Sequence, residues 1–516
     1  MNYSASKTTK SVKNGLVAMS FFVITIFIQF YSRKIFLVGL GADILGLTST
    51  LVNMLEFLNL AELGVGTAIG FSLFKPLSLN DYQSVNEIVT FQGLLYRRIA
   101  ILILVCAIVL SCFFPLIFEK SGLPLWYAYA SFFTMLFSSM IGYFFNYRQV
   151  ILSSSQQEYR IIYSYRLTQL IKIIFQMTAV YYSNFGYIWW VILEAVFVVI
   201  SAVALHYVTQ KAFPDLKTGV LSYKELSLKY GKLRTKIKQL FFHKIGSFAL
   251  YQSSPLIIYA FISLNEVTLY MNYMLISAGI LQLFNAIYNG VGAGVGNVVA
   301  QGDWNYSKTI FNEIFSLRFV SSWIVFVTFF MTAGSFVTFW IGADYILPMN
   351  TTILIGIILF LNLIRYTVDI YIQANGIYGD IYAPISEAVI NLTLSISLGY
   401  LMGLNGILTG IIISQIAIVI LWKPYYLLSK FPIFKFRRYI LKLLSHFLMS
   451  IICTIPSLIL YHLIDIHLYT TGFYRFITLT IILFTSLIVS NGLGFYITGS
   501  PFKNALFRLK SIRSLK

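Results

Sequence analysis

Charged residues and cysteines are both scarce in this sequence of 516 residues. Asp, Glu, Lys and Arg make up 11% of the chain, whereas 58% of it is hydrophobic and the mean hydropathy is +0.79. This composition excludes an ordinary soluble domain and leaves room for a dozen or more membrane helices of about 20 residues each. The three cysteines, Cys106, Cys112 and Cys453, lie inside apolar runs, which argues against a disulfide framework.

Motifs typical of enzymes are absent as well. The sequence contains no P-loop, no HExxH motif and no DxD-type carboxylate pair in a soluble segment. Its most metal-like cluster, His462, Asp465 and His467, lies on one short loop and lacks a defined ligand scaffold. We therefore expect a protein that is not an enzyme and that holds neither a cofactor nor a metal ion.

The basic residues that are present follow a pattern of their own. Short loops rich in Lys and Arg stay on the cytoplasmic side of a membrane, and here the basic residues fill alternate gaps between apolar segments. The pattern predicts a multi-pass membrane protein with both termini in the cytoplasm, and it explains the net charge of +19 without nucleic acid as a partner. Of the 37 basic residues, 32 lie in the gaps 1–13, 75–98, 148–172, 211–244, 301–318, 423–442 and 503–516.

The apolar segments predict an all-α polytopic membrane protein with about 14 transmembrane helices. The count stays open between about 12 and 14, since two of the segments are interrupted by glycine. The segments are 14–38, 44–74, 90–118, 123–147, 162–183, 186–210, 240–263, 267–299, 314–341, 348–374, 382–402, 405–428, 439–464 and 471–498.

The longest basic gap separates two similar halves. The motifs at Leu63–Gly66 and Ala293–Gly296 stand about 230 residues apart with six spans between them, so the halves repeat in the same orientation, as in many secondary transporters. We expect two six-helix lobes related by this parallel pseudo-repeat, and a peripheral C-terminal helix pair. The expected domains are the N-lobe 1–213, a basic amphipathic cytoplasmic linker 214–239, the C-lobe 240–430, and the helix pair with its basic tail 431–516.

The linker carries a helical periodicity. Leu226, Tyr230, Leu233, Ile237 and Leu240 recur at steps of three and four, opposite a face of lysines. This pattern is typical of an amphipathic helix that lies on an anionic membrane surface. A solvated linker helix has the same periodicity, so both interpretations stay open.

Polar residues inside the spans mark the candidate site, because each costs free energy in hydrocarbon unless it is solvated or paired. The amides and hydroxyls among them are explained best as hydrogen bonds between helices. The cations Arg33, Lys172 and Arg365 instead predict a hydrated cavity for an anionic substrate, since arginine binds phosphate through a planar fork of donors. An ion pair with Asp369, four residues on, is an alternative for Arg365. Arg318 is expected at the cytoplasmic interface.

The complete set of candidates has two parts. An alternative to substrate binding by Lys34 is that its side chain extends outward to the membrane surface. The tyrosines in the polar helix faces are candidates to stack on sugar rings. The predicted substrate-binding residues are Arg33, Lys172, Arg365, Lys34, Asn285, Asn289, Tyr366 and Gln29. The residues expected to serve as coupling groups or in structural ion pairs are Glu62, Asp369 and Glu387.

Four stretches near the N-terminus carry a family resemblance. They are SRKIF at 32–36, LGADILGL at 40–47, LAELGVGTAI at 60–69 and LFKPL at 73–77. Together they resemble Wzx-type polysaccharide flippases, which belong to the multidrug/oligosaccharidyl-lipid/polysaccharide exporter superfamily. Outside residues 30–100 the resemblance is one of topology, with two six-helix lobes and a final pair.

The resemblance implies a function. The substrate would be an oligosaccharide repeat unit on undecaprenyl pyrophosphate, moved by alternating access from the cytoplasmic to the outer leaflet of the bacterial inner membrane. The products would be surface polysaccharides such as O-antigen of lipopolysaccharide, capsule or exopolysaccharide, with a polysaccharide polymerase as a candidate partner. By position Arg33 corresponds to a cation that meets the pyrophosphate. The sugars, the coupling ion and the oligomeric state stay open.

Two other classes remain as alternatives. A cation-coupled multidrug exporter of the MATE type typically has twelve spans and an acid in its first helix, whereas the first span here has Arg33 and Lys34 and no acid. A polysaccharide polymerase or membrane glycosyltransferase usually has a large outer loop, and the outer connections of this chain are short. The flippase is therefore the favoured hypothesis.

Overall fold

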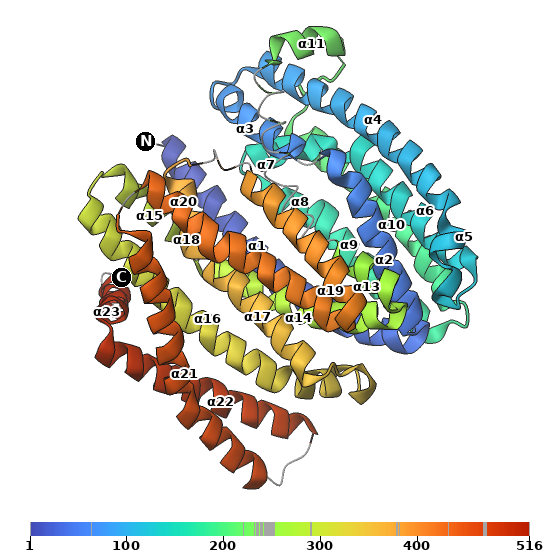
Figure 1. The fold of residues 1–516 in the computed structure, drawn as a ribbon. Coiled ribbons are helices and arrows are strands. Elements are labelled where there is room, and N and C mark those ends of the chain that lie inside the picture. Colours follow the sequence, from blue (N-terminus) through green and yellow to red (C-terminus); the bar gives the residue numbers. More distant parts are fainter. Residues whose placement is uncertain are drawn as a thin grey trace. The chain divides into compact units, whose positions relative to one another are not determined.

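The chain folds entirely into helices over the part that its structure describes. This computed structural model describes residues 2–62, 64–219, 221–231, 253–288, 291–377, 382–431, 433–467 and 472–514, with the single residues 233, 237, 241 and 380. Within these residues there are α-, 3-10 and π-helices and no strand (Figure 1). The all-α class predicted from the composition is confirmed.

The helices form two compact units, Met1–Thr268 (unit 1) and Leu269–Lys516 (unit 2), and the boundary falls inside α14. The predicted domain limits at 213, 239 and 430 stay predictions. The α-helices of unit 1 are α1 (Asn2–Leu40), α2 (Ala42–Leu58), α3 (Val65–Ser78), α4 (Tyr82–Cys112), α5 (Phe114–Ile117), α6 (Leu125–Phe144), α7 (Gln149–Ser154), α8 (Glu158–Ile161), α9 (Leu167–Tyr182), α10 (Gly186–Ala212), α11 (Tyr223–Lys229) and α13 (Ser254–Phe261). Its short elements are η1 (Asn59–Glu62), η2 (Glu119–Ser121), η3 (Asn146–Arg148) and the π-helix η4 (Ile162–Arg166).

Unit 2 begins within α14 and contains the remaining elements. Its α-helices are α14 (Leu264–Tyr288), α15 (Val291–Ala300), α16 (Trp304–Trp340), α17 (Met349–Ile364), α18 (Tyr366–Ala374), α19 (Tyr382–Gln415), α20 (Lys423–Lys430), α21 (Phe436–His467), α22 (Gly472–Thr498) and α23 (Ser500–Ser514). Its short elements are η5 (Ala343–Tyr345) and the π-helix η6 (Ile416–Trp422).

Nine helices of the described residues are long and apolar enough to cross a membrane, or ten if the bent pair α6 and η3–α7 is one span. The longest, Tyr382–Lys430, is interrupted at Gly403, where φ is 58° and ψ is −137°. Its two arms pack so closely that a Cβ atom on Gly410 would collide with the backbone of Ser395. One element therefore contains two predicted spans, and about 14 spans fit this helix set.

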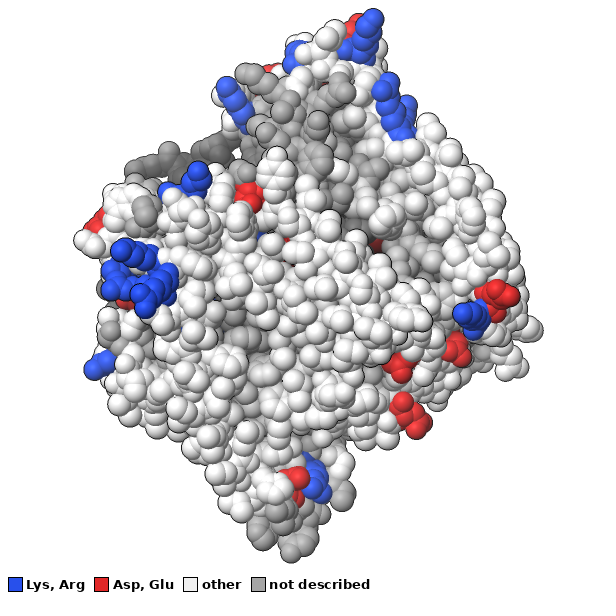
Figure 2. Space-filling model, viewed as in Figure 1, with Lys and Arg blue, Asp and Glu red and all other residues white. Residues whose placement is uncertain are grey.

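The surface of the helices is apolar. Large side chains such as Phe27 on α1 and Leu401 on α19 are 71% and 74% exposed. Figure 2 shows uncharged surface over most of the face in view, with Lys, Arg, Asp and Glu in small groups. Hydrocarbon is a favourable surrounding for such side chains, and helices satisfy their own backbone hydrogen bonds there. The chain is a multi-pass membrane protein.

The amphipathic linker packs on unit 1 in its described part. Helix α11 begins with a capping box, in which Ser222 and Glu225 each bond the other's backbone N–H. Leu226 is fully buried, and Leu233 is 4% exposed in the same apolar cluster. Protein therefore covers the apolar face of the linker at Leu226 and Leu233. This contradicts a helix that lies on a membrane surface there, whereas Lys224 and Glu225 are exposed, as in the solvated linker helix.

Polar contacts hold α11 against the start of α4. Glu87 accepts hydrogen bonds from Lys229 Nζ at 2.6 Å and from the Tyr230 hydroxyl at 2.7 Å. The guanidinium of Arg98 lies 3.4 Å from the centre of the Tyr223 ring, a cation–π contact. The linker thus has a defined docking position on unit 1.

Candidate functional site

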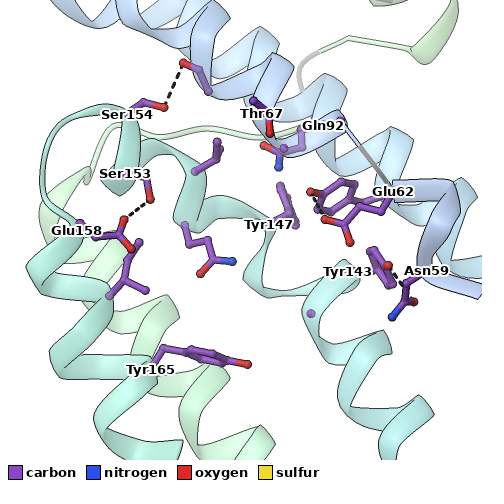
Figure 3. A pocket seen from close by; sticks show the side chains of 18 of the residues that line it. Asn59, Glu62, Thr67, Gln92, Tyr143, Tyr147, Ser153, Ser154, Glu158 and Tyr165 are labelled. Atoms are coloured by element: carbon purple, nitrogen blue, oxygen red, sulfur yellow. Dashed lines mark hydrogen bonds between the residues drawn. The ribbon is translucent and has the colours of Figure 1, made fainter. Parts of the chain in front are cut away.

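A cavity of about 980 Å³ lies within unit 1, lined by residues of α2, η1, α3, α4, α6, η3, α7, α8 and η4. Figure 3 shows Asn59, Glu62, Tyr143 and Tyr165 around it. Glu56, Asn59 and Glu62 are three residues apart, a spacing that drifts around an α-helix. The structure converts residues 59–62 into the 3-10 turn η1, and residues three apart align in such a turn. Asn59 and Glu62 are thereby brought to one side of the chain.

Two tyrosines fix the polar groups of η1. The Tyr96 hydroxyl donates to Glu62 Oε1 at 2.7 Å, and the Tyr143 hydroxyl donates to Asn59 Oδ1 at 3.1 Å. The two rings meet edge to face, with their centres 5.5 Å apart. Since both tyrosines are buried, the carboxylate and the amide are held in defined orientations at the cavity wall.

The cavity is acidic. Glu56, Glu62 and Glu158 line it together with Arg166. Arg166 is already paired with Glu158 at 3.1 Å. Among the described residues, neither Glu56 nor Glu62 forms an ion pair, so two carboxyl groups of the wall have no cationic partner. None of the predicted cations lines this cavity.

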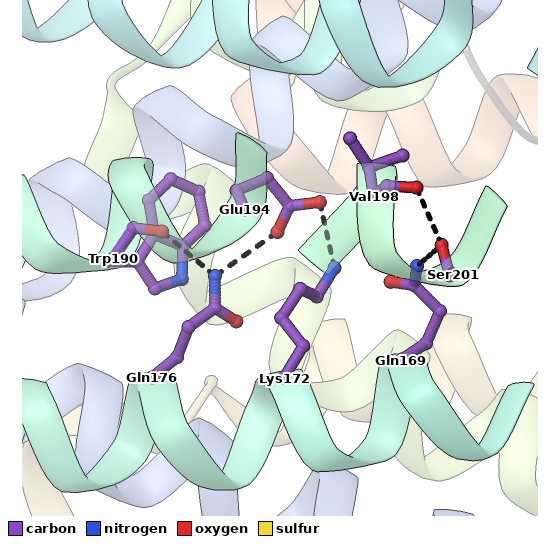
Figure 4. A network of polar contacts seen from close by, with 7 residues as sticks. All are labelled: Gln169, Lys172, Gln176, Trp190, Glu194, Val198 and Ser201. Carbon is purple, nitrogen blue, oxygen red and sulfur yellow. Dashed lines mark hydrogen bonds and ion pairs between the residues drawn. The ribbon is translucent and has the colours of Figure 1, made fainter. Parts of the chain in front are cut away.

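Lys172 belongs to a different network, between α9 and α10 (Figure 4). Its ammonium lies 2.8 Å from Glu194 Oε1, and its side chain is 12% exposed. Gln176 donates to Glu194 Oε2 at 3.2 Å and to the Trp190 carbonyl at 3.0 Å. Glu194 was not a predicted site residue, although an acid deep in an apolar span indicates a partner. The structure supplies that partner, and the pair lies between two neighbouring helices.

The structure brings three of the predicted residues of unit 2 together. Arg365 Nε lies 2.8 Å from Asp369 Oδ2, which makes the ion pair four residues apart that the sequence allowed. Lys423 approaches the other oxygen of Asp369 at 3.5 Å. Glu387 is 3% exposed, and its charge interacts with those of Arg365, Asp369 and Lys423. The spacing did not indicate Lys423, because it joins the cluster from the far arm of the hairpin α19–α20.

Arg318 is buried, contrary to its expected place at the cytoplasmic interface. Its side chain is 1% exposed and its Nε donates to the Leu363 carbonyl at 2.8 Å. That carbonyl lies where α17 ends, and the last carbonyls of a helix lack an intrahelical donor. The guanidinium is 4.8, 4.3 and 4.7 Å from the ring centres of Phe284, Tyr288 and Tyr366. The Tyr366 ring is therefore one of three that pack around a cation of the protein itself. The Tyr366 hydroxyl donates to the Tyr288 carbonyl.

The remaining predicted residues are dispersed. Arg33 Nη2 donates to the Thr268 carbonyl at 3.4 Å within unit 1. Gln29 and Lys34 are exposed on α1, and Asn285 is exposed on α14. Asn289 lies outside the described residues.

No metal centre is found in the described part of the chain, since no three His, Cys, Asp or Glu residues gather there as ligands. The predicted cluster of His462, Asp465 and His467 lies at the end of α21 and not on a loop, and its Asp465 pairs with Arg475 at 2.8 Å.

No protein-family model and no curated protein matches the sequence. Among solved structures, the chain is similar to lipid II flippase MurJ in an inward closed conformation, with a TM-score of 0.65 and 15% identity over 94% of this chain and 99% of that one. It is also similar to an inward-facing MATE family multidrug resistance transporter of the MOP superfamily, with a TM-score of 0.57 and 13% identity over 81% and 99%. An outward-facing MATE transporter gives 0.54 and 14% over 83% and 97%. The chain has the fold of these transporters.

Proposed function

We propose that the protein is a Wzx-type flippase of the inner membrane of a bacterium. It moves an oligosaccharide linked to undecaprenyl pyrophosphate from the cytoplasmic to the outer leaflet, for O-antigen, capsule or exopolysaccharide synthesis. Both termini lie in the cytoplasm, and a polysaccharide polymerase is the partner that receives the product.

The cavity of unit 1 is the observation that carries this proposal. Its volume of about 980 Å³ is in the upper part of the range for ligand sites, which suits several sugar rings. Its wall combines carboxylates, amides and hydroxyls with tyrosine rings. The polar groups match the hydroxyls of a sugar, and the rings offer apolar faces against which a sugar can stack.

The extent of the fold likeness supports a flippase. The similarity to MurJ covers 94% of this chain, whereas the inward-facing MATE transporter covers 81%. The difference is about 67 residues. Helices α21 and α22, which form the predicted C-terminal pair, have 32 and 27 residues. A chain with this extra pair fits the architecture of a lipid flippase better than that of a twelve-span exporter.

The cavity lowers the barrier to flipping. Each sugar hydroxyl that enters hydrocarbon without a partner costs several kcal/mol, so an oligosaccharide cannot cross a bilayer unaided. A polar cavity supplies hydrogen-bond partners to the sugar during the whole crossing, while the lipid tail stays in the bilayer. The two units alternate access to the two leaflets.

We assign the pyrophosphate to Arg33 from its position in the sequence. Arg33 lies in the stretch that resembles flippases, and its planar fork of donors suits two phosphate oxygens.

Deletion of the gene tests the proposal. We expect surface polysaccharide to be lost and lipid-linked oligosaccharide to accumulate in the cytoplasmic leaflet, and the wild-type gene to reverse both effects. Arg33→Ala restores little polysaccharide, Arg33→Lys restores part of it, and Arg97→Ala, at an exposed arginine of α4, restores all of it. Normal polysaccharide in the deletion strain contradicts the proposal.

The acidity of the cavity favours one second candidate, a multidrug exporter of the MATE type. Uncompensated charges at Glu56 and Glu62 would attract a cationic drug as well as a sugar. This candidate predicts that the deletion strain becomes sensitive to cationic dyes and antibiotics while its polysaccharide stays normal. The same strain therefore separates the two functions.

A further inference from the structure

We infer that the cavity of unit 1 selects an oligosaccharide that carries a protonated amino group, which Glu56 and Glu62 bind. This inference rests on the proposed function and names the class of sugar that the flippase prefers. It concerns charge selection inside the cavity and is independent of the cation that meets the pyrophosphate.

The charge of the wall is the first argument. Arg166 offsets Glu158, and the described residues of the wall include no other Lys or Arg. Two acids therefore remain without a cationic partner, Glu56 and Glu62. In a cavity partly shielded from water, such charges attract a cation more strongly than in bulk solvent and repel a carboxylate. A sugar unit with a uronic acid is disfavoured in this place.

The balance of donors and acceptors is the second argument. Gln92 lines the cavity and is 2% exposed, and its Oε1 has no hydrogen-bond partner among the described residues. Figure 3 places Gln92 beside Thr67 and Tyr147 at the cavity. This single unmatched acceptor favours a ligand that offers a donor. An ammonium group has three N–H donors, and sugar hydroxyls add more.

The geometry of η1 is the third argument. Tyr96 donates to one oxygen of Glu62, which orients the carboxylate at the cavity wall. The rings of Tyr96 and Tyr143 are attached to the same wall, and aromatic faces stabilise ammonium groups by about 0.5–2 kcal/mol. Carboxylate and aromatic groups thus favour the same kind of ligand.

A metal ion is a poorer occupant than an ammonium group. Metal sites of carboxylate oxygens need several ligands converging on one point. The described residues hold no group of three or more His, Cys, Asp or Glu that converges in this way. A cavity of about 980 Å³ is also far larger than one ion requires.

The test is direct binding to the full-length protein in lipid nanodiscs. The probes are farnesyl-pyrophosphate-linked disaccharides that end in glucosamine, in N-acetylglucosamine or in glucuronic acid, at a pH where the sugar amine is protonated. We expect glucosamine to bind about tenfold more tightly than N-acetylglucosamine, which corresponds to about 1.4 kcal/mol. The glucuronic acid probe binds most weakly.

The double variant Glu56→Gln/Glu62→Gln should lose this preference and still bind the N-acetylglucosamine probe, which shows that it is folded. The control Glu119→Gln/Glu225→Gln removes two exposed acids of unit 1 outside the cavity and should keep the preference. Replacing sodium by potassium should change neither result.

Three outcomes overturn the inference. They are equal binding of the amine and N-acetyl probes by the wild type, an unchanged preference in the double variant, and a preference that depends on sodium, which would indicate a coupling-ion site. All three leave the proposed function intact as long as the lipid-linked probes bind. Failure of every probe to bind contradicts the proposed function itself.

Discussion

The acids of unit 1 and the cations of unit 2 differ in whether neighbouring groups compensate their charge. Glu56 and Glu62 line a cavity without an ion pair among the described residues. Arg318 is enclosed by three aromatic rings, and Arg365 is neutralised by Asp369. A buried charge without compensation costs several kcal/mol, whereas a charge that faces a hydrated cavity keeps much of its solvation. The comparison teaches that depth in a span does not identify a binding residue, because compensation decides whether a charge is available to a ligand.

The Lys172–Glu194 pair shows the same difference in charge compensation within one unit. It lies in unit 1, as the cavity does, yet its charges satisfy each other at 2.8 Å. The contact joins α9 and α10. The following predictions are ordered from the largest expected effect to the smallest.

Removal of the Arg318 side chain should cause the largest loss. Arg318→Ala leaves a cavity among three rings and frees the Leu363 carbonyl, so we expect the free energy of unfolding to fall by about 3–5 kcal/mol. Thermal and denaturant unfolding of the purified protein measure the change. The exposed Arg97→Ala should change it by about 0.5 kcal/mol or less. An Arg318→Ala protein as stable as the wild type would show that this cation is not structural.

Breaking the Lys172–Glu194 pair from one side should come next. Glu194→Leu leaves a buried ammonium without its carboxylate and should destabilise the protein by about 3 kcal/mol. The double variant Lys172→Met/Glu194→Leu removes both charges, and we expect it to return to within about 1 kcal/mol of the wild type. Unfolding measured across this double-mutant cycle gives the coupling energy. Additive losses in the cycle would contradict a structural pair.

Loss of one hydrogen bond at the cavity should have a smaller effect. Tyr96→Phe deprives Glu62 of its hydroxyl donor and should lower stability by about 1.5 kcal/mol, since the acceptor is charged. We also expect weaker binding of the amine probe, because the carboxylate is no longer oriented. Tyr259→Phe, which removes a hydroxyl bond to the Ile117 carbonyl outside the cavity, should affect stability alone. Equal effects of both variants on binding would argue against an orienting role.

The smallest effect concerns the pH dependence of linker docking. Burial by itself raises the pKa of the Glu87 carboxyl, but hydrogen bonds from Lys229 and Tyr230 outweigh it and hold the pKa below the ordinary value of 4.5. A carboxyl with a lowered pKa in the docked state stabilises docking above pH 4.5, and this contribution is lost as the pH falls through the lowered value. The linker should therefore stay docked at neutral pH and loosen only in acid.

Electron paramagnetic resonance can follow this release. Spin labels at positions 97 and 224, both exposed in unit 1, report the distance between α4 and α11 after the native cysteines are replaced. We expect the distance distribution to broaden below pH 4.5 in the wild type and to be broad at every pH in Glu87→Gln. A variant with the distribution of the wild type would contradict a role for Glu87 in docking.

Several features followed from the sequence because they depend on local composition. Spans such as 186–210 and 471–498 are predominantly apolar, and α10 and α22 (Gly472–Thr498) correspond to them. The pair of Arg365 and Asp369 was accessible because residues four apart face the same side of a helix. The acid at 62 was a candidate because it lies in a motif of the resembling family.

Other features depend on where the helices pack. The periodicity of the linker was correct, but only the packed structure shows that Leu226 meets unit 1 and not lipid. Asn59 and Glu62 face the same side of the chain because Asn59–Glu62 forms a 3-10 turn, which a spacing of three does not reveal. Arg318 has no partner near it in sequence, since its rings come from α14 and α18.

By itself, the sequence determined the all-α membrane class and the candidate ionisable residues. These follow from hydrophobicity and charge, which each segment carries whatever its neighbours are. Only the tertiary structure decided which of those charges are compensated. An ion pair such as Lys172–Glu194, a ring around Arg318, or an open cavity beside Glu62 requires residues from different helices, and their meeting is set by the packing of the whole unit.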